Sequence, residues 1–414
     1  MEFGLIGEKL GHSFSREIHT RLCGYEYELR ELKPEELTEF LRKREFRGIN
    51  VTIPYKESVI PYLDGISERA AAIGAVNTVV NRGGKLFGDN TDFAGMEALL
   101  RREGIVPAGR KVLILGSGGT SKTATAVATA MGAGSIFRVS RKKQDNCITY
   151  EEAYGNHSDA EIIINATPVG MYPNGGVSPI DVARFPKLCG VVDAIYNPLR
   201  TSLVLAAKER GIPATGGLYM LVAQAAAAAE LFVGGTVPQE DTERVYRELL
   251  AQKESIVLTG MPGAGKTTVG RMLAKQLGRE FVDTDDVIVR ESGTDIPTIF
   301  RERGEAGFRE IEADVIRRVS AQGGIVLATG GGAVLRAENV AALRSNGRLF
   351  WLDRPIEKIT AFDGRPLSAD RKALEARFAE REPIYRATCD VHIAADGSPE
   401  AVAAQITAQE GSSV

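Results

Sequence analysis

The sequence predicts an α/β protein built from several domains, and three observations lead to this fold class. The chain has 414 residues, which is too long for one hydrophobic core and indicates two or three domains. Two separate segments have the order apolar strand, glycine-rich turn, helix. Short continuous apolar runs are typical of buried parallel strands, so each segment can open a doubly wound domain.

Composition excludes several classes of partner. With 43% hydrophobic and 25% charged residues, the chain has the composition of an ordinary globular protein. Its formal net charge of −3 gives no reason to expect nucleic acid or an anionic membrane as a partner. Anionic small molecules would need local basic pockets.

The cysteines and the apolar segments predict a cytoplasmic protein. The four cysteines include no C-x-x-C pair, which argues against a disulfide framework or a zinc site and fits a reducing cytosol. The N-terminus begins with a strand-like run, Phe3–Ile6, without the features of a signal peptide. The most apolar stretch, Met220–Val233, is too short to span a bilayer.

The first glycine-rich turn predicts a dinucleotide site. It joins the strand Lys111–Leu115 to an alanine-rich helix, and its glycines let the backbone approach a pyrophosphate at the start of that helix. Ser121 stands where the G-x-G-x-x-G fingerprint has its third glycine, so a plain structural turn is the alternative. The predicted cofactor contacts are Gly116, Ser117, Gly118 and Gly119.

The next predicted strand, Ser135–Ser140, indicates which dinucleotide binds. An NAD site has an acidic residue near this point, whereas here the strand runs into a basic segment that ends at Lys143. Arginine at this point accommodates a 2′-phosphate, which favours NADP(H), and a solvated basic turn is the alternative. The further predicted cofactor contacts are Ser140, Arg141 and Lys142.

The residues ahead of the first turn predict a separate substrate domain. Hydroxyls, amides, one lysine and one aspartate gather there at turns and strand ends, an inventory that suits a polyol carboxylate. Lysine and aspartate can also form a proton-transfer pair. Taken one at a time, each cluster is equally well explained as a turn or a helix cap. The clusters are Ser13–Ser15, Asn50–Lys56, Gly74–Thr78 and Asp89–Asp92.

With two later segments, these clusters resemble the shikimate dehydrogenases up to about residue 240. The family includes relatives that use quinate or NAD, but the paired serines and the basic segment favour shikimate and NADP. The matching segments are Gly11–Ser15, Asn50–Lys56, Gly74–Thr78, Asp89–Asp92, Asn165–Met171 and Gly217–Gln224.

This resemblance implies roles for individual residues. Lys56, assisted by Asp92, would donate a proton as hydride arrives from NADPH, and Ser13 and Ser15 would hold the substrate carboxylate. The residues implied to bind or approach the substrate hydroxyls are Asn50, Thr52, Asn77, Asp92, Tyr196 and Gln224. The residues implied on the nicotinamide and ribose side are Asn165, Ala166, Thr167, Met171 and Gly217.

The second turn, Gly260–Thr267, fits G-x-x-x-x-G-K-[ST] in full. It lies between the predicted strand Ser255–Thr259 and the predicted helix Lys266–Leu277. Backbone N–H groups of such a loop cradle phosphates, while the lysine reaches the β- and γ-phosphates and the hydroxyl ligates Mg²⁺. Many NTPases share this motif. The predicted ATP contacts are Gly260, Gly263, Ala264, Gly265, Lys266, Thr267 and Thr268, with Thr267 also a magnesium ligand.

Two carboxylates, Asp283 and Asp285, follow at the end of the next predicted strand. In an extended segment residues two apart point the same way, so we expect both to face one site. One can serve Mg²⁺ while the other receives an acceptor hydroxyl. An acidic helix N-terminus, the alternative, fits Asp286 better than the pair.

The remaining segments resemble shikimate kinases, within the nucleoside-monophosphate-kinase-like class, over about residues 254–412. They are Phe308–Glu310, the strand Ile325–Thr329 with the glycines after it, Gly364–Leu367 and Arg381–Tyr385. The resemblance implies that Asp283 acts on Mg²⁺ through water and that Arg365 contacts ATP and stabilises the transferring phosphate. The residues implied to bind shikimate are Asp285, Arg309, Gly330, Gly331, Gly332 and Arg381.

The segment between Asp353 and Arg365 departs from the kinase pattern. Arg354 is its only arginine, so the family's adenine-contacting arginine is missing, and we expect Lys358 in its place.

The sequence therefore predicts a split substrate-binding α/β domain with a Rossmann NADP-binding domain, followed by a P-loop kinase domain with a parallel sheet. The predicted bounds are 1–94, 95–216, 217–253 for return helices and junction, and 254–414. The implied function is bifunctional, with 3-dehydroshikimate and shikimate as small-molecule substrates and NADP(H), ATP and Mg²⁺ as cofactors. The alternatives for the second half are an ATP-sensing module or a kinase for another small metabolite.

Overall fold

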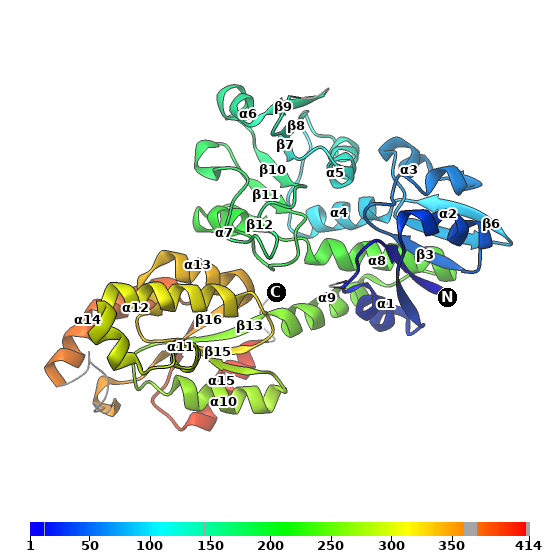
Figure 1. Ribbon diagram of the computed structural model, residues 1–414. Helices are drawn as coiled ribbons and strands as arrows, with labels where there is room; N and C mark the ends of the chain where they lie inside the picture. Colours follow the sequence, from blue (N-terminus) through cyan, green and yellow to red (C-terminus); the bar gives the residue numbers. More distant parts are fainter. Residues whose placement is uncertain (12, 144–145, 360–370, 411–414) are drawn as a thin grey trace. The chain divides into compact units, whose positions relative to one another are not determined.

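The computed structural model describes residues 1–11, 13–143, 146–359 and 371–410. The chain forms two compact units, Met1–Asn197 with Leu203–Glu248, and Pro198–Ser202 with Leu249–Val414. In Figure 1 the first unit runs from blue to green and the second from green to red. None of the helices among the described residues has the length and apolarity that a membrane crossing needs.

The first sheet of the first unit has six strands in the order β2-β1-β3-β5-β6-β4. Strand β1 pairs in parallel with β2 and β3, whereas β5 is antiparallel to β3 and β6. Alternate residues of β1 face opposite sides, because Ile6 packs with α2 whereas Phe3 and Leu5 pack with Phe232 of α8. The elements are β1 (Phe3–Gly7), α1 (Ser15–Cys23), β2 (Tyr27–Glu31), α2 (Pro34–Lys43), β3 (Gly48–Val51), η1 (Ile60–Tyr62), β4 (Gly65–Ile66), α3 (Glu68–Ile73), β5 (Thr78–Arg82), β6 (Lys85–Asp89) and α4 (Thr91–Arg102).

The second sheet of this unit has six parallel strands in the order β12-β11-β10-β7-β8-β9. This is the Rossmann order, in which the succession of strands reverses between β7 and β10, the point where such sheets bind ligands. Val112 and Ile114 face α4 and α5, whereas Leu113 and Leu115 face α6 and α7. The elements are β7 (Lys111–Leu115), α5 (Gly119–Ala130), β8 (Ser135–Ser140), β9 (Cys147–Thr149), α6 (Tyr150–Asn156), β10 (Ile162–Asn165), η2 (Val182–Arg184), β11 (Gly190–Asp193), α7 (Ser202–Glu209) and β12 (Ala214–Thr215).

Helix α8 (Leu218–Val233) joins the two sheets of the first unit. It packs against α4 so closely that a Cβ on Gly95 would lie 2.5 Å from the Met220 carbonyl oxygen. The same helix reaches the first sheet through Phe232. Helix α9 (Gln239–Lys253) follows, and the division between the units falls within it.

The second unit has one parallel sheet of five strands in the order β14-β15-β13-β16-β17. Helices α10 and α15 cover one face and α12 and α13 the other (Figure 1). Helix α12 bends at Gly304, where φ is 67°. The elements are β13 (Ser255–Thr259), α10 (Lys266–Leu277), β14 (Phe281–Asp283), α11 (Thr284–Ser292), α12 (Ile296–Ser320), β15 (Val326–Ala328), η3 (Ala333–Leu335), α13 (Ala337–Asn346), β16 (Gly347–Asp353), η4 (Ile356–Lys358), α14 (Arg371–Thr388), β17 (Val391–Ala394) and α15 (Pro399–Glu410).

The predicted strands that precede the two glycine-rich turns and the helix Lys266–Leu277 are confirmed to the residue. The extended conformation predicted through Asp283 and Asp285 is wrong. Strand β14 ends at Asp283, which caps α11 by accepting a hydrogen bond of 3.0 Å from the Asp285 N–H. The capping carboxylate satisfies an N–H group that the helix cannot pair internally, so the helix begins there.

Candidate functional sites

The register of the first sheet gathers the predicted substrate residues at one edge. Asn50 of β3 lies opposite Thr78 of β5, and Thr78 lies opposite Asp89 of β6. Strand β1 is parallel to β3, so the turn after β1 that leads to Ser13 and Ser15 leaves the sheet at the same edge. Segments far apart in the sequence therefore converge here.

Lys56 and Asp92 form the central pair of this edge. Lys56 Nζ donates to Asp92 Oδ2 at 2.5 Å, and the two side chains are 24% and 15% exposed. Asp92 also accepts from Asn77 Nδ2 at 2.9 Å. Asp92 lies in the first turn of α4, at the positive end of the helix dipole. The ammonium is thus oriented by a carboxylate that is itself held by an amide.

A buried hydrogen-bonded chain supports this pair from behind. Asn77 Oδ1 accepts from the Thr91 N–H at 2.7 Å and from Thr78 Oγ1 at 3.0 Å. Asn50 Nδ2 donates to Thr78 Oγ1 at 3.0 Å, and Asn50 Oδ1 accepts from the Tyr27 hydroxyl at 2.7 Å. Both the nitrogen and the oxygen of the Asn50 amide are therefore hydrogen-bonded within the protein. Its predicted contact with substrate stays a prediction.

Replacement of Tyr27 by phenylalanine tests this chain. We expect a loss of about 1–3 kcal/mol in the free energy of unfolding, because the buried Asn50 oxygen loses its donor. Dehydrogenase kcat/KM should fall about tenfold as Asn77 and Asp92 lose support. Urea unfolding and NADPH oxidation measure the two effects.

The control is Tyr62→Phe, because the Tyr62 hydroxyl is hydrogen-bonded to Thr38 at 2.6 Å, outside this chain. It should lose stability without losing kcat/KM. Equal kcat/KM losses in both variants would mean that the Tyr27 effect is general destabilisation.

The other predicted substrate residues have the following contacts. The Ser13 hydroxyl donates to Ser15 Oγ at 3.1 Å. Gln224 of α8 is buried and donates to the Leu221 carbonyl oxygen at 2.8 Å. The Tyr196 ring, 5.5 Å from the Phe14 ring, follows β11, and burial raises the pKa of its phenol. Thr52 is half-buried directly after β3.

The dinucleotide turn has the geometry that a pyrophosphate needs. Gly116 has φ of 115°, and a Cβ there would lie 3.1 Å from the Ala166 carbonyl oxygen, so a side chain is excluded. Gly118 and Gly119 open α5 with free space beside them, and the first turn of α5 has no acidic residue. An anion can therefore approach the positive end of α5.

Ser121, which replaces the third glycine of the fingerprint, closes this turn. Its buried hydroxyl donates to the Gly116 carbonyl oxygen at 2.7 Å. The departure from the fingerprint thus leaves the turn intact.

The remaining predicted cofactor residues lie near this turn or in its supporting loops. The Ser140 hydroxyl donates to the Lys142 carbonyl oxygen, while Arg141 and Lys142 are exposed at the end of β8, where a phosphate can reach them. Asn165 ends β10, and its Oδ1 accepts from the N–H and the hydroxyl of Thr167. Of the other three predicted cofactor residues, Ala166 follows Asn165, Met171 is exposed, and Gly217 is the N-cap of α8. This set fits NADP(H).

The P-loop of the second unit begins at Gly260 and ends where α10 starts. Lys266, only 8% exposed, donates from Nζ to the carbonyl oxygens of Gly260 and Met261 at 2.8 and 2.9 Å. Gly263 and Gly265 both have positive φ, which lets successive N–H groups turn toward one point. The predicted ATP contacts Ala264 and Thr268 lie in this loop and in the first turn of α10.

Thr267 and Asp283 form the candidate magnesium site. Thr267 Oγ1 donates to Asp283 Oδ2 at 2.8 Å, which sets a hydroxyl beside a carboxylate. Mg²⁺ prefers such oxygen ligands, usually completed by water and substrate phosphates. The described residues contain no cluster of three or more His, Cys, Asp or Glu side chains suited to a metal.

A cavity of about 570 Å³ adjoins the P-loop. It is lined by most of the predicted ATP and kinase-substrate residues, including Asp285, Arg309 and Arg381. Gly330 lies close to two carboxylates, because a Cβ there would lie 2.9 Å from Asp285 Oδ1 and 2.8 Å from Glu312 Oε1. The lid arginine predicted at Arg365 lies outside the described residues. The other residues predicted to bind the kinase substrate that line the cavity are Gly331 and Gly332.

Sequence reasoning missed Glu312, the most deeply buried charged residue of this cavity. Its Oε2 accepts from Arg309 Nη1 at 2.6 Å, whereas its buried Oε1 has no hydrogen-bond partner among the described residues. Burial raises the pKa of Glu312, despite the Arg309 guanidinium. The helical spacing of three residues after Arg309 was the available signal.

Arg381 also has a buried polar atom without a hydrogen-bond partner among the described residues. Its Nη1 donates to the Gly331 carbonyl oxygen at 3.1 Å, but its buried Nε has no acceptor among the described residues. Buried polar atoms are normally paired, so the free Nε and the free Glu312 oxygen indicate a polar ligand. A carboxylate with adjacent hydroxyls would satisfy both.

Comparisons with known proteins find matches for both units of the chain. A family model described as shikimate dehydrogenase substrate binding domain matches residues 5–79, and one described as shikimate kinase matches residues 262–409. The chain is 38% identical over 265 residues to the shikimate dehydrogenase (NADP(+)) of Clostridium perfringens, covering 60% of this chain and 97% of that protein.

Solved structures resemble the first unit. The shikimate dehydrogenase of Peptoclostridium difficile is 38% identical, with a TM-score of 0.55, and the match covers 60% of this chain and 98% of that one. The enzyme of Thermus thermophilus in complex with NADP(H) and shikimate is 32% identical, with a TM-score of 0.55, covering 60% and 99%.

The fold and the two sites define a dinucleotide-dependent oxidoreductase joined to a P-loop kinase in one chain. The relatives narrow this class. The chain belongs to the shikimate dehydrogenase family and carries a shikimate kinase domain in its second unit.

Proposed function

We propose that this chain catalyses two consecutive reactions of aromatic biosynthesis. The first unit reduces 3-dehydroshikimate to shikimate with NADPH, and the second phosphorylates shikimate to shikimate 3-phosphate with MgATP. One observation carries the pairing: two separate parts of the chain match families that share one metabolite, the product of the first reaction and the substrate of the second.

In the reductase, NADPH supplies the hydride. The Lys56 ammonium donates a proton to the oxygen that becomes the C5 hydroxyl, and Asp92 orients that ammonium. Asn77 and Gln224 bind the neighbouring hydroxyls, while Ser13 and Ser15 bind the carboxylate. The protein thus contributes orientation and one proton to chemistry that belongs to the cofactor.

In the kinase, MgATP supplies the phosphoryl group. Asp285 orients the acceptor hydroxyl and takes its proton, while Arg309 and Arg381 bind the substrate carboxylate. We add Glu312 to this set, because its free Oε1 can accept a hydroxyl of the substrate. Lys266 stabilises the charge on the phosphates.

We also propose a cytoplasmic location, since both cofactors are used there and the chain's four cysteines are free thiols. The domain bounds 1–94, 95–216, 217–253 and 254–414 are part of the proposal. Small molecules are its substrates.

A two-part assay on the purified chain tests the proposal. With 3-dehydroshikimate we expect NADPH to be oxidised faster than NADH, because the exposed cations Arg141 and Lys142 at the end of β8 suit a 2′-phosphate. With shikimate and MgATP we expect equimolar ADP and shikimate 3-phosphate. ATP that alters the dehydrogenase rate without a phosphorylated product would instead indicate an ATP-sensing module. Phosphorylation of a different acceptor would indicate another metabolite kinase.

A further inference from the structure

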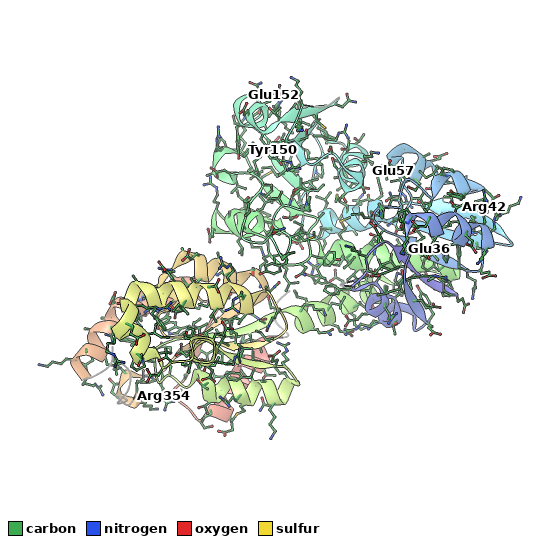
Figure 2. All side chains as sticks on the ribbon, viewed as in Figure 1. Glu36, Arg42, Glu57, Tyr150, Glu152 and Arg354 are labelled. Atoms are coloured by element: carbon green, nitrogen blue, oxygen red, sulfur yellow. The ribbon has the colours of Figure 1, made fainter. Side chains whose placement is uncertain are left out.

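One arginine beside the P-loop has no role in the mechanism above. Arg354 follows β16, the strand that pairs with β13 and places Trp351 opposite Thr259, the residue before the P-loop. Its half-buried side chain, labelled in Figure 2, belongs to the second unit. A Cβ built on Gly265 would lie 3.9 Å from Arg354 Nη1. The guanidinium therefore borders the last glycine of the P-loop.

Most of this guanidinium is uncommitted. Arg354 Nε donates to the Lys358 carbonyl oxygen at 3.3 Å, and neither Nη1 nor Nη2 has an acceptor among the residues that the structure describes. Arginine has five N–H donors in a fixed planar array, so the two terminal nitrogens can both serve a ligand. A half-buried cation with free donors favours an anion at this place.

Lys358, which we expected to replace the missing arginine of the kinase pattern, is directed elsewhere. Its Nζ donates to the Asp396 carbonyl oxygen at 2.7 Å, which links the segment after β16 to the segment after β17. The structure thus points to Arg354, and not Lys358, as the cation nearest the P-loop on this side.

The position of Arg354 indicates which part of a nucleotide it meets. The cavity beside the P-loop is lined by the predicted ATP contacts Gly263, Gly265 and Thr267 and by the predicted acceptor residues, but not by Arg354. The phosphoryl group that is transferred must face the acceptor, so the rest of the nucleotide extends away from the acceptor residues. Arg354 borders the P-loop at Gly265 without lining this cavity, a position that suits the non-transferred phosphates.

We infer that Arg354 binds the nucleoside triphosphate through oxygens of its α- and β-phosphates. This inference rests on the proposed kinase function and adds a nucleotide-binding residue that neither the P-loop motif nor the expected replacement Lys358 supplies. The planar guanidinium suits phosphate geometry, and its Nε bond to the Lys358 carbonyl oxygen sets its orientation.

Calorimetric titration of Arg354→Ala and Arg354→Lys with MgADP, and with magnesium tripolyphosphate as a probe that lacks a nucleoside, tests the inference. We expect Arg354→Ala to weaken both ligands about tenfold or more, because a charge-assisted contact is lost. Lysine should recover part of the affinity, since it keeps the charge without the planar array. KM for ATP should rise with KM for shikimate unchanged.

Two control variants separate this contact from general charge effects. Arg290→Ala removes an exposed arginine of α11 whose nearest carboxylate, that of Glu291, is 3.9 Å away, and it should leave MgADP affinity unchanged. Lys275→Ala, on an exposed position of α10, should do the same. An unchanged MgADP affinity in Arg354→Ala would overturn the inference, and so would a loss for MgADP without a loss for tripolyphosphate.

The outcome does not depend on the identity of the acceptor. If the wild-type chain binds MgADP but does not phosphorylate shikimate, the kinase proposal fails, whereas the binding comparison at Arg354 still decides this inference.

Discussion

Replacement of Lys56 by methionine should reduce dehydrogenase kcat by about 10² to 10⁴-fold, the usual contribution of a positioned general acid. Methionine has a similar length but no proton to donate. The Lys56 ammonium lies 2.5 Å from Asp92, so its removal also leaves that half-buried carboxylate without its cation. Steady-state NADPH oxidation with 3-dehydroshikimate measures the loss.

The matched control is Lys122→Met in the same unit. Lys122 Nζ pairs with Glu57 at 2.8 Å on the surface, and this exposed pair contributes little stability. We expect near-normal dehydrogenase rates in this variant, and a normal kinase rate on supplied shikimate in both. A Lys56→Met variant within a few-fold of the wild-type rate would exclude Lys56 as the proton donor.

Replacement of Lys266 by methionine should have the largest effect on the second reaction. We expect kcat for shikimate phosphorylation to fall by about 10² to 10³-fold, the cost of removing one charged or hydrogen-bonding group that stabilises a transition state. The dehydrogenase rate should be unchanged. ADP release from supplied shikimate measures the effect.

This substitution also has a structural cost. The Lys266 ammonium donates to two P-loop carbonyl oxygens, at 2.8 and 2.9 Å, and its loss removes a hydrogen-bond donor from each of them. Thermal unfolding must therefore accompany the assay. Lys275→Met, on an exposed position of α10, is the control for an unrelated lysine on the same helix. A Lys266→Met variant that is folded and fully active would contradict the assigned role.

Local features of the sequence determined the positions of the strands and the glycine-rich turns. A buried parallel strand is a short apolar run, and a glycine-rich turn marks the point where it gives way to a helix. The strands Lys111–Leu115 and Ser255–Thr259 and the helix Lys266–Leu277 could therefore be predicted to the residue. The P-loop could be predicted as well, because its contacts with phosphate come from consecutive residues.

Sequence spacing gave a wrong geometry for the acidic pair. Asp283 and Asp285 both line the cavity, as expected, but through a helix cap and not through an extended strand. The two arrangements have the same sequence pattern, and the choice between them depends on where the strand stops pairing. Strand β14 pairs with β15 only as far as Asp283, so the chain is free to begin a helix there.

Tertiary structure alone decided which distant residues meet. Antiparallel pairing of β5 with β3 and β6 places Asn50, Thr78 and Asp89 side by side, and no local pattern specifies that register. The Tyr27 hydroxyl could be assigned to Asn50 only once β2 and β3 were placed on either side of β1. In the second unit, the pairing of β16 with β13 brought Arg354 to the P-loop. The physical reason is the same in each case. These contacts depend on the order of the strands in the sheet, and that order is set by the packing of the whole sheet. The distance between two segments along the chain does not reveal it.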